Sequence, residues 1–268
     1  MHRTAPDRLR RLVPVLAGLV VLAGLLAAPA VHATSAARPA MDFRDATRFQ
    51  LFYVYAADRA PVAARPAAIQ HIAAQVDTWL AAQIGGGLSP RFVTGADGRP
   101  TVLSIRSSLK SSVLNKREDI SYDAMPSYVA RGLVKSKVLP IFMIEGEQDY
   151  DACAWYWDGD NGPYISFPLA NCDIIPTVDD DFPDYGSYTL AHEIVHALGA
   201  VDDRAPHEDG TSHIKGDPQD LMMGGEWDEV DWDNLTLDPG HDDYLRTGRS
   251  DLVNIETSAL LERSTARR

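Results

Sequence analysis

The strongest constraint on the fold is the stretch at residues 192–202, which reads HEIVHALGAVD. Its two histidines are four residues apart, so on a helix they lie on one face, about one turn from each other. Imidazole nitrogens placed in this way can hold one Zn²⁺ at roughly 2.0–2.1 Å each. Glu193, beside the first histidine, is not needed as a ligand and is placed to take a proton from a water that the metal activates.

The residues around the histidines predict an amphipathic helix. Leu190, Ile194 and Leu198 form an apolar stripe along one side of it. At roughly 100° per residue, His192 and His196 project from nearly the opposite side. We therefore expect the stripe to pack on a core while the two histidines face a cleft.

A third ligand is expected after the end of this helix. Gly199 predicts a sharp turn, because glycine readily adopts the left-handed conformation. After that turn Asp202 can return toward the metal, which leaves the fourth position of a tetrahedral site open. His207 and His213 in the following loop could each replace Asp202 if the chain runs differently, although the spacing favours Asp202.

The pattern H-E-x-x-H-x-x-G-x-x-D resembles the zinc signature of the metzincin metallopeptidases, and its aspartate form is similar to the snapalysin-type secreted bacterial neutral proteases. A second mark of that clan, the Met-turn, is matched by residues 220–225, which read DLMMGG. By the family's pattern Met222 would lie beneath the zinc as a soft hydrophobic base. The resemblance covers roughly residues 188–225.

The resemblance also implies a fold. We expect an α+β, metzincin-like protein in which a twisted mixed sheet and packed helices form an N-terminal lobe. The active-site helix closes this lobe, and an irregular C-terminal lobe carries the Met-turn. In this reading residues 47–268 form a single catalytic domain, with lobes at about 47–199 and about 200–268.

Residues 1–33 are typical of a secretory signal peptide. Four arginines precede an apolar run from Leu12 to Ala30, and residues 31–33 (VHA) place small side chains at the outer and inner cleavage positions. An uncleaved membrane anchor is the alternative, but Pro14 and Pro29 bracket the run and the cleavage pattern follows it directly. The sequence thus predicts a secreted, extracellular protein that does not contact the membrane after cleavage, with a flexible lead-in at residues 34–46.

The charge balance excludes some partners. The chain has 25 Lys and Arg against 38 Asp and Glu, a net charge of −13. Residues 1–33 carry four Arg and one Asp, so their removal leaves about −16. Such a surface argues against binding nucleic acid or anionic membranes. We expect a monomer whose partner is a peptide or protein substrate.

Two further features concern cysteines and carboxylates. Cys153 and Cys172 are the only cysteines, and in an exported chain two cysteines most simply form one disulfide. The carboxylates of residues 179–181 and Asp184 could bind Ca²⁺, but they lack EF-hand spacing, which favours a solvated acidic loop.

The remaining patterns predict the other elements of the fold. These are a strand at 49–56, a helix at 65–84, a hairpin joining 92–93 to 101–105, a helix at 126–137, a buried strand at 139–144, a hairpin with strands at 154–157 and 164–167, and a short helix at 252–261. The hairpin at 152–167 is our candidate for a sheet edge that binds an extended peptide through main-chain hydrogen bonds.

Together these features predict a zinc metalloendopeptidase. Zn²⁺ would be held by His192, His196 and Asp202, and Glu193 would act as the general base. The alternative is a catalytically inactive, zinc-binding exported protein that uses a metzincin-like fold to bind partners. A zinc hydrolase that acts on a bond other than a peptide bond is a further class.

Overall fold

The computed structural model describes residues 45–114, 128, 131–135, 137–146, 152–159, 162–171, 176–179, 182–224 and 230–263. All of them belong to the larger of two compact units, Pro39–Arg268. The predicted signal peptide, nearly all of the lead-in and Cys172 lie outside the described residues. The signal peptide and the disulfide between Cys153 and Cys172 therefore stay predictions.

A five-stranded mixed sheet forms the centre of this unit, with the strand order β3-β1-β4-β6-β5. Four strands run parallel, and β5 runs antiparallel to its neighbour β6 at one edge. The strands are β1 (Arg48–Tyr55), β3 (Val102–Arg106), β4 (Val138–Ile144), β5 (Trp155–Gly159) and β6 (Gly162–Pro168). The predicted mixed sheet, with the 152–167 hairpin at its edge, is confirmed.

The central strands are mostly apolar because both of their faces are covered; β4 is apolar throughout, whereas β1 also contains Arg48 and Gln50. Every residue of β4 is buried, and so are six of the eight residues of β1. Phe52 in β1 lies opposite Phe142 in β4, and the two rings stack with centroids 5.4 Å apart. Continuous apolar runs of this kind are typical of parallel strands that are buried on both sides.

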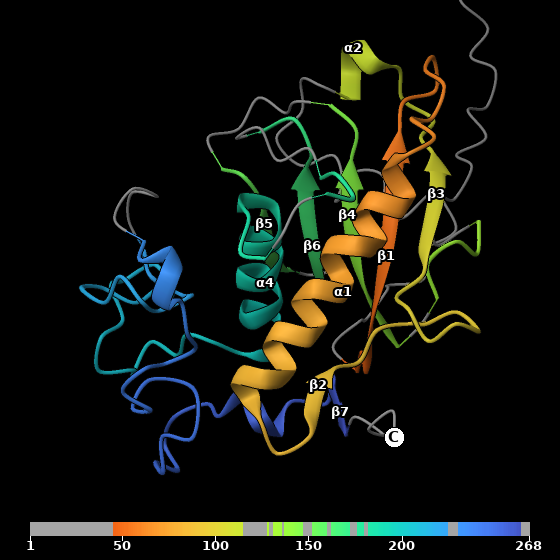
Figure 1. The fold of residues 1–268 in the computed structure, drawn as a ribbon. Coiled ribbons are helices and arrows are strands. Elements are labelled where there is room, and N and C mark those ends of the chain that lie inside the picture. The colour runs from red at the N-terminus through yellow and green to blue at the C-terminus, as the bar shows by residue number, and fades with distance from the viewer. Residues whose placement is uncertain are drawn as a thin grey trace, which may run out of the picture. The chain divides into compact units, whose positions relative to one another are not determined.

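Two helices, α1 (Arg65–Ile84) and α4 (Tyr185–Leu198), pack side by side over one face of the sheet (Figure 1). In α1, Pro66 lies in the first turn, where its missing N–H is tolerated, and Gly85 caps the C-terminus. The buried face of α1 repeats at helical spacing, at Ile69, Ile72, Val76, Leu80 and Ile84. Both helices were predicted at these positions.

Non-local pairing changes the prediction at two places. A short second sheet pairs β2 (Leu88–Pro90) with β7 (Leu261–Arg263), and sequence patterns revealed neither strand. The predicted helix at 252–261 is wrong, because only a 3₁₀ turn, η4 (Ile255–Thr257), forms before β7. A second 3₁₀ turn, η3 (Trp232–Asn234), lies in the otherwise irregular chain after α4.

The predicted hairpin around residues 95–98 is present, but it is short. Thr101 donates its N–H to the carbonyl of Val93 at 2.9 Å, and Thr94 bridges Pro100. Beyond this bridge, β3 leaves the hairpin and pairs in parallel with β1.

The predicted helix at 126–137 is wrong at its C-terminal end, although Tyr128 within it is helical. Residues 131–135 form turns and bends, and Lys137 has a positive φ of 65°. The other residues of this segment lie outside the described residues. A single helical turn, α2 (Ser111–Leu114), occurs earlier.

Across the described ranges, none of the helices combines the length and the apolar content that crossing a bilayer requires.

The helix α4 begins with a capping box. The Asp184 carboxylate accepts from the backbone N–H groups of Gly186 at 2.8 Å and Ser187 at 3.2 Å. Ser187 returns the contact, because its hydroxyl oxygen accepts from the N–H of Asp184 at 3.0 Å. These bonds satisfy backbone donors at the helix start that have no partner within the helix. Asp184 is thus a helix cap in this structure.

We expect Asp184→Ala to lower the free energy of unfolding by about 1 kcal/mol, because the substitution leaves the first turn of α4 uncapped. Urea denaturation monitored by far-ultraviolet circular dichroism measures the change. Asp179→Ala removes an exposed carboxylate from the segment before the helix and serves as the control. Equal stability of the two variants would contradict the capping role.

Candidate metal centre

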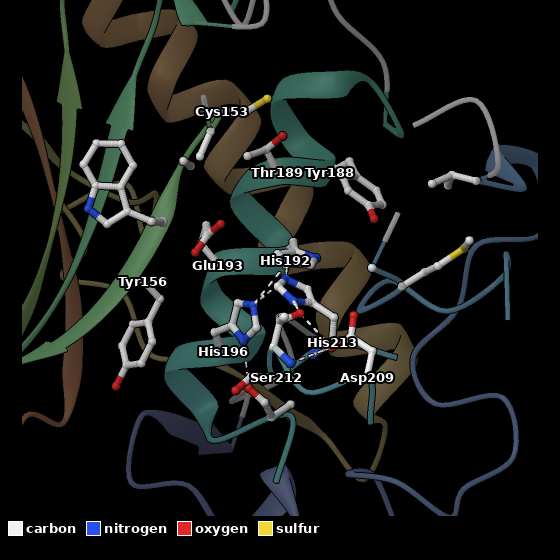
Figure 2. Close-up of a pocket in the computed structure, with 18 of the residues that line it drawn as sticks. Cys153, Tyr156, Tyr188, Thr189, His192, Glu193, His196, Asp209, Ser212 and His213 are labelled. Atoms are coloured by element: carbon white, nitrogen blue, oxygen red, sulfur yellow. Dashed lines mark hydrogen bonds between the residues drawn. The ribbon is translucent and has the colours of Figure 1, made fainter. Parts of the chain in front are cut away.

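Three histidine side chains converge beside α4 (Figure 2). His192 and His196 project from the helix, and His213 approaches from the loop that follows it. Their Nε2 atoms lie 3.2 Å apart for His192 and His196, 3.1 Å for His192 and His213, and 3.4 Å for His196 and His213. The structure therefore brings together the two predicted helix ligands and one of the alternatives for the third.

Backbone carbonyls determine the tautomers of the two helix histidines. The Nδ1 atom of His192 lies 2.8 Å from the carbonyl oxygen of Leu221, and that of His196 lies 2.9 Å from the carbonyl oxygen of Ala200. A carbonyl can only accept a hydrogen bond, so Nδ1 carries the proton in both rings. In the neutral imidazoles, Nε2 is then an unprotonated atom with a lone pair.

Side chains impose the same tautomer on His213. The hydroxyl of Thr211 donates its single proton to Oδ1 of Asp209 at 2.6 Å. Its oxygen lies 3.0 Å from Nδ1 of His213 and can only accept there. Nδ1 of His213 is consequently the protonated nitrogen, and its Nε2 joins the other two as an acceptor.

This arrangement fits a tetrahedral metal. Three lone pairs directed at one another from 3.1–3.4 Å cannot form hydrogen bonds among themselves, and they repel. In a tetrahedral zinc site with metal–nitrogen bonds of roughly 2.0–2.1 Å, neighbouring donor atoms are about 3.3–3.4 Å apart. The observed edges are close to that value, and three protein donors leave one corner to a ligand from outside the protein.

Burial keeps the helix histidines neutral, as metal ligands must be. Burial lowers the pKa of His192 well below its usual value, and the adjacent His196 and His213 lower it further. Burial also lowers the pKa of His196 to about 4, with a smaller contribution from His213. Both rings are therefore unprotonated at Nε2 at neutral pH.

Asp202, the expected third ligand, lies outside this group. Its Oδ1 accepts from the backbone N–H and Nε of Arg204, and its Oδ2 accepts from the same guanidinium at 2.6 Å. The hydrogen bond from the Arg204 side chain lowers the pKa of Asp202 to about 2. The geometry thus favours His213 over Asp202, because a neighbour two residues away already occupies both carboxylate oxygens.

The position of His213 depends on the residue that follows it. Ile214 is buried and bridges Met223, and its N–H donates to the carbonyl of Met222 at 2.7 Å. Gly224 donates its N–H to the carbonyl of Ile214, also at 2.7 Å. An isolated apolar residue beside a histidine in a polar loop was the signal in the sequence that could have identified this ligand.

The turn at residues 220–224 helps to orient the histidines of the centre. The Leu221 carbonyl accepts from both His192 and the hydroxyl of Tyr188, the latter at 3.0 Å. Met222 is fully buried, whereas Met223 lines the pocket in front of the histidines. The interpretation of this segment as a Met-turn, with Met222 beneath a metal, stays a prediction.

A buried polar network holds this turn in place. Oδ1 of Asp220 accepts from the N–H of Met222 at 2.7 Å and from the hydroxyl of Tyr244 at 2.5 Å. The Tyr244 oxygen accepts in turn from the N–H of Asp238. The carboxylate of Asp238 accepts from the backbone of residues 242–245. The chain after η3 therefore stabilises the turn that orients His192.

Glu193 has the environment expected of a proton acceptor. Its side chain is buried, one of its oxygens, Oε2, has no hydrogen-bond partner, and the residue lines the same pocket as the histidines. The backbone N–H of Tyr156 in β5 donates to the carboxylate. Burial raises the pKa of Glu193 to about 8, although the bond from Tyr156 opposes the shift. Glu193 does not belong to the three-nitrogen group.

A pocket of about 810 Å³ opens between β5 and the histidine centre. Residues 152–156 and Asp158 form one wall, and residues 209, 211–213, 223 and 224 form the opposite one. The ring of Tyr156 stacks at 6.5 Å over that of His196. Apart from the three histidines, the described residues of the pocket wall include the acidic side chains of Glu193, Asp158 and Asp209, and none of those described residues is Lys or Arg.

His207, the other alternative ligand, lies in a different group. The ring Nδ1 of His207 is 2.8 Å from Oδ2 of Asp243, and the backbone N–H of His207 donates to Oδ1 of Asp243. It is largely exposed, and Asp242 lies nearby at 3.9 Å. Of the residues suggested for Ca²⁺, Asp184 caps α4, and Asp180 and Asp181 lie outside the described residues.

Comparisons with known proteins add distant structural likenesses. No family model matches the chain, and no curated protein matches it. The crystal structure of wild-type OgpA from Akkermansia muciniphila is similar with a TM-score of 0.45 and 12% identity, over 72% of this chain and 58% of that one. A second crystal form of wild-type OgpA gives a TM-score of 0.39 at 10% identity, over 57% of this chain and 48% of that one.

A third solved structure is of catalytically inactive OgpA in complex with an O-glycopeptide substrate. It gives a TM-score of 0.31 at 11% identity, over 44% of this chain and 35% of that one. This chain thus matches at most about 58% of the length of these structures. At such scores the likeness carries no argument about function, which has to come from the site itself.

We expect His213→Ala to weaken metal binding by more than the roughly 10–100-fold that loss of a supporting partner costs, because a donor atom itself is removed. Asp202→Ala should bind metal like the wild type. Competition with a chromophoric chelator measures both affinities. The reverse result, with loss only in Asp202→Ala, would show that the three-histidine group does not bind the metal.

The buried Asp220 should make stability depend on pH. Burial raises its pKa from 3.8 to about 7. Between these values the folded protein keeps a proton that the unfolded chain has released, so the free energy of unfolding falls as the pH rises. We expect Asp220→Asn to reduce this fall between about pH 4 and pH 7, as measured by urea midpoints. Asp233→Asn, at an exposed position, is the control, and an unchanged pH dependence in Asp220→Asn would contradict the raised pKa.

Proposed function

We propose that this protein is a zinc-dependent peptidase in which His192, His196 and His213 hold the metal and Glu193 is the general base. The observation that carries the proposal is the convergence of three unprotonated Nε2 atoms within 3.4 Å, beside a buried carboxylate with an unpartnered oxygen. This donor set has the chemistry that zinc requires. The H-E-x-x-H pattern and its resemblance to metzincin signatures support the same reaction class.

Bound Zn²⁺ would supply Lewis acidity, which polarises a peptide carbonyl and makes a water molecule more acidic. The protein's own part is proton transfer. Oε2 of Glu193 accepts the proton of the attacking water and returns it to the amine nitrogen that leaves. Burial raises the pKa of Glu193 to about 8, which strengthens the carboxylate as a proton acceptor and lets it hold the proton until the amine nitrogen takes it.

The edge strand β5 supports a peptide substrate. It is the outermost strand of the sheet on the side of the pocket, and residues 155, 156 and 158 line that pocket. An extended peptide can pair with such an edge through main-chain hydrogen bonds, which need little sequence specificity. This orientation would place a scissile bond between β5 and the histidine centre, beside Glu193, as an endopeptidase requires.

Residues 1–33 support the further proposal that the peptidase acts outside the cell. The four arginines, the apolar run and the small residues at positions 31 and 33 are the parts of a cleavable export signal. Mass spectrometry of the protein from the culture medium would test this, because cleavage after Ala33 gives a new N-terminus at Thr34.

We expect Glu193→Gln to retain stoichiometric zinc and to lose casein hydrolysis by at least about 100-fold, because the amide cannot accept the proton. Metal content by mass spectrometry and turnover of casein are the two measurements. Glu262→Gln, which alters a partly exposed ion pair on β7, is the matched control. Full activity in Glu193→Gln would rule out its role as base, and a zinc-loaded wild type without peptidase activity would favour the inactive partner-binding alternative.

A further inference from the structure

The third histidine differs from the other two in what orients its ring. Backbone carbonyls accept from Nδ1 of His192 and His196, so no side-chain substitution removes these acceptors. For His213 the acceptor is the hydroxyl of Thr211. The tautomer of the third ligand therefore depends on side chains, and it can be altered without changing the backbone that supports the other two.

Asp209 completes this relay. Oδ1 of Asp209 accepts from the Thr211 hydroxyl at 2.6 Å and from the Thr211 N–H at 2.7 Å. With its proton committed to the carboxylate, the hydroxyl oxygen is directed as an acceptor toward His213. Figure 2 shows Asp209 and His213 together on the side of the centre away from β5. A water molecule could replace the hydroxyl as an acceptor, but it would lack this fixed orientation.

The close approach of the relay to the 220–224 turn is possible only because residue 224 is glycine. A Cβ on Gly224 would lie 2.5 Å from Oδ2 of Asp209 and 2.9 Å from Cβ of His213. The turn that supports His192 thus also lies close to the carboxylate of Asp209 and to the Cβ of His213. Three hydrogen bonds link Asp209, Thr211 and the His213 ring, and the close approach of Gly224 is a separate observation at the same residues.

We propose that Thr211 and Asp209 are positioning residues for the third ligand, which hold His213 in its Nδ1-protonated tautomer and thereby set the affinity of the centre for metal. This inference rests on the proposed function, because it takes the three histidines to be the metal site. Partners that orient a ligating histidine typically contribute about 10–100-fold to metal affinity.

The test compares Thr211→Val, which keeps the side-chain shape but removes the hydroxyl, with Thr211→Ser, which restores it. Thr78→Val removes the exposed hydroxyl that bonds the Ala74 carbonyl in α1 and is the matched control. Zinc affinity is measured by chelator competition, and the state of His213 is measured by long-range ¹H–¹⁵N correlation spectra of the metal-free protein. Thermal melting of the metal-free variants shows whether each is folded.

We expect Thr211→Val to bind zinc about 10–100-fold more weakly and to show a mixture of both His213 tautomers, with Thr211→Ser and Thr78→Val close to the wild type. Wild-type affinity and a single Nδ1-protonated tautomer in Thr211→Val would overturn the inference. If Thr211→Val does not fold, Asp209→Ala tests the same relay, because a hydroxyl freed from the carboxylate can rotate and donate to Nδ1.

The two proposals fail in different ways. If the wild type binds no zinc, the proposed function fails, while the tautomer measured in the metal-free protein still reports on the relay. If the wild type binds zinc and His213→Ala does not, but Thr211→Val binds normally, the metal site stands and only the positioning role is overturned.

Discussion

Repulsion between three imidazole lone pairs is the constraint on which the rest of the site depends. Neutral rings would normally rotate or exchange tautomers to convert such contacts into hydrogen bonds. In this protein they cannot, because the Leu221 and Ala200 carbonyls and the Thr211 hydroxyl each require a proton on Nδ1. The fold therefore maintains an arrangement that is unfavourable by itself and becomes favourable when a cation lies among the nitrogens.

Each acceptor belongs to a different part of the chain, so the fold as a whole assembles the centre. The Ala200 carbonyl follows directly from the end of α4, where Gly199 adopts a positive φ of 114°. A Cβ at that position would also meet Val253 at 2.9 Å. The Leu221 carbonyl belongs to a turn held by the buried Asp220 and Tyr244. The capping box at Asp184 fixes where α4 begins, and the buried residues Leu190, Ile194 and Leu198 pack its other side on the core.

Local patterns predicted the elements whose periodicity and boundaries are encoded locally. The helix α1 has a proline at its start, glycines at its end and a regular apolar face, β4 is an uninterrupted apolar run, and β1 contains one from Leu51 to Tyr55. The α4 helix with its buried Leu190, Ile194 and Leu198 was predicted for the same reason. The pairing of β2 with β7 joins residues about 170 positions apart, and no local pattern in either strand identifies its partner.

The candidate site divides in the same way. His192, Glu193 and His196 are related by one helical turn, so their spacing alone brought them together. The choice between Asp202 and His213 depended on interactions that spacing does not contain. The carboxylate of Asp202 forms a local ion pair with Arg204. By contrast, the bridge between buried Ile214 and Met223 places His213 beside the 220–224 turn.

The position of His213, the third nitrogen donor, in a loop has a thermodynamic consequence. His213 is 17 residues from His196, and its loop lies largely at the surface. Ordering such a loop costs conformational entropy, which is offset here by the bridge from Ile214 to Met223 and by the bonds of Asp209. A ligand held by these few contacts couples metal binding to the order of the loop, because the metal stabilises only the state in which the loop is in place. The core positions the two histidines of α4, and the loop that carries His213 completes the site.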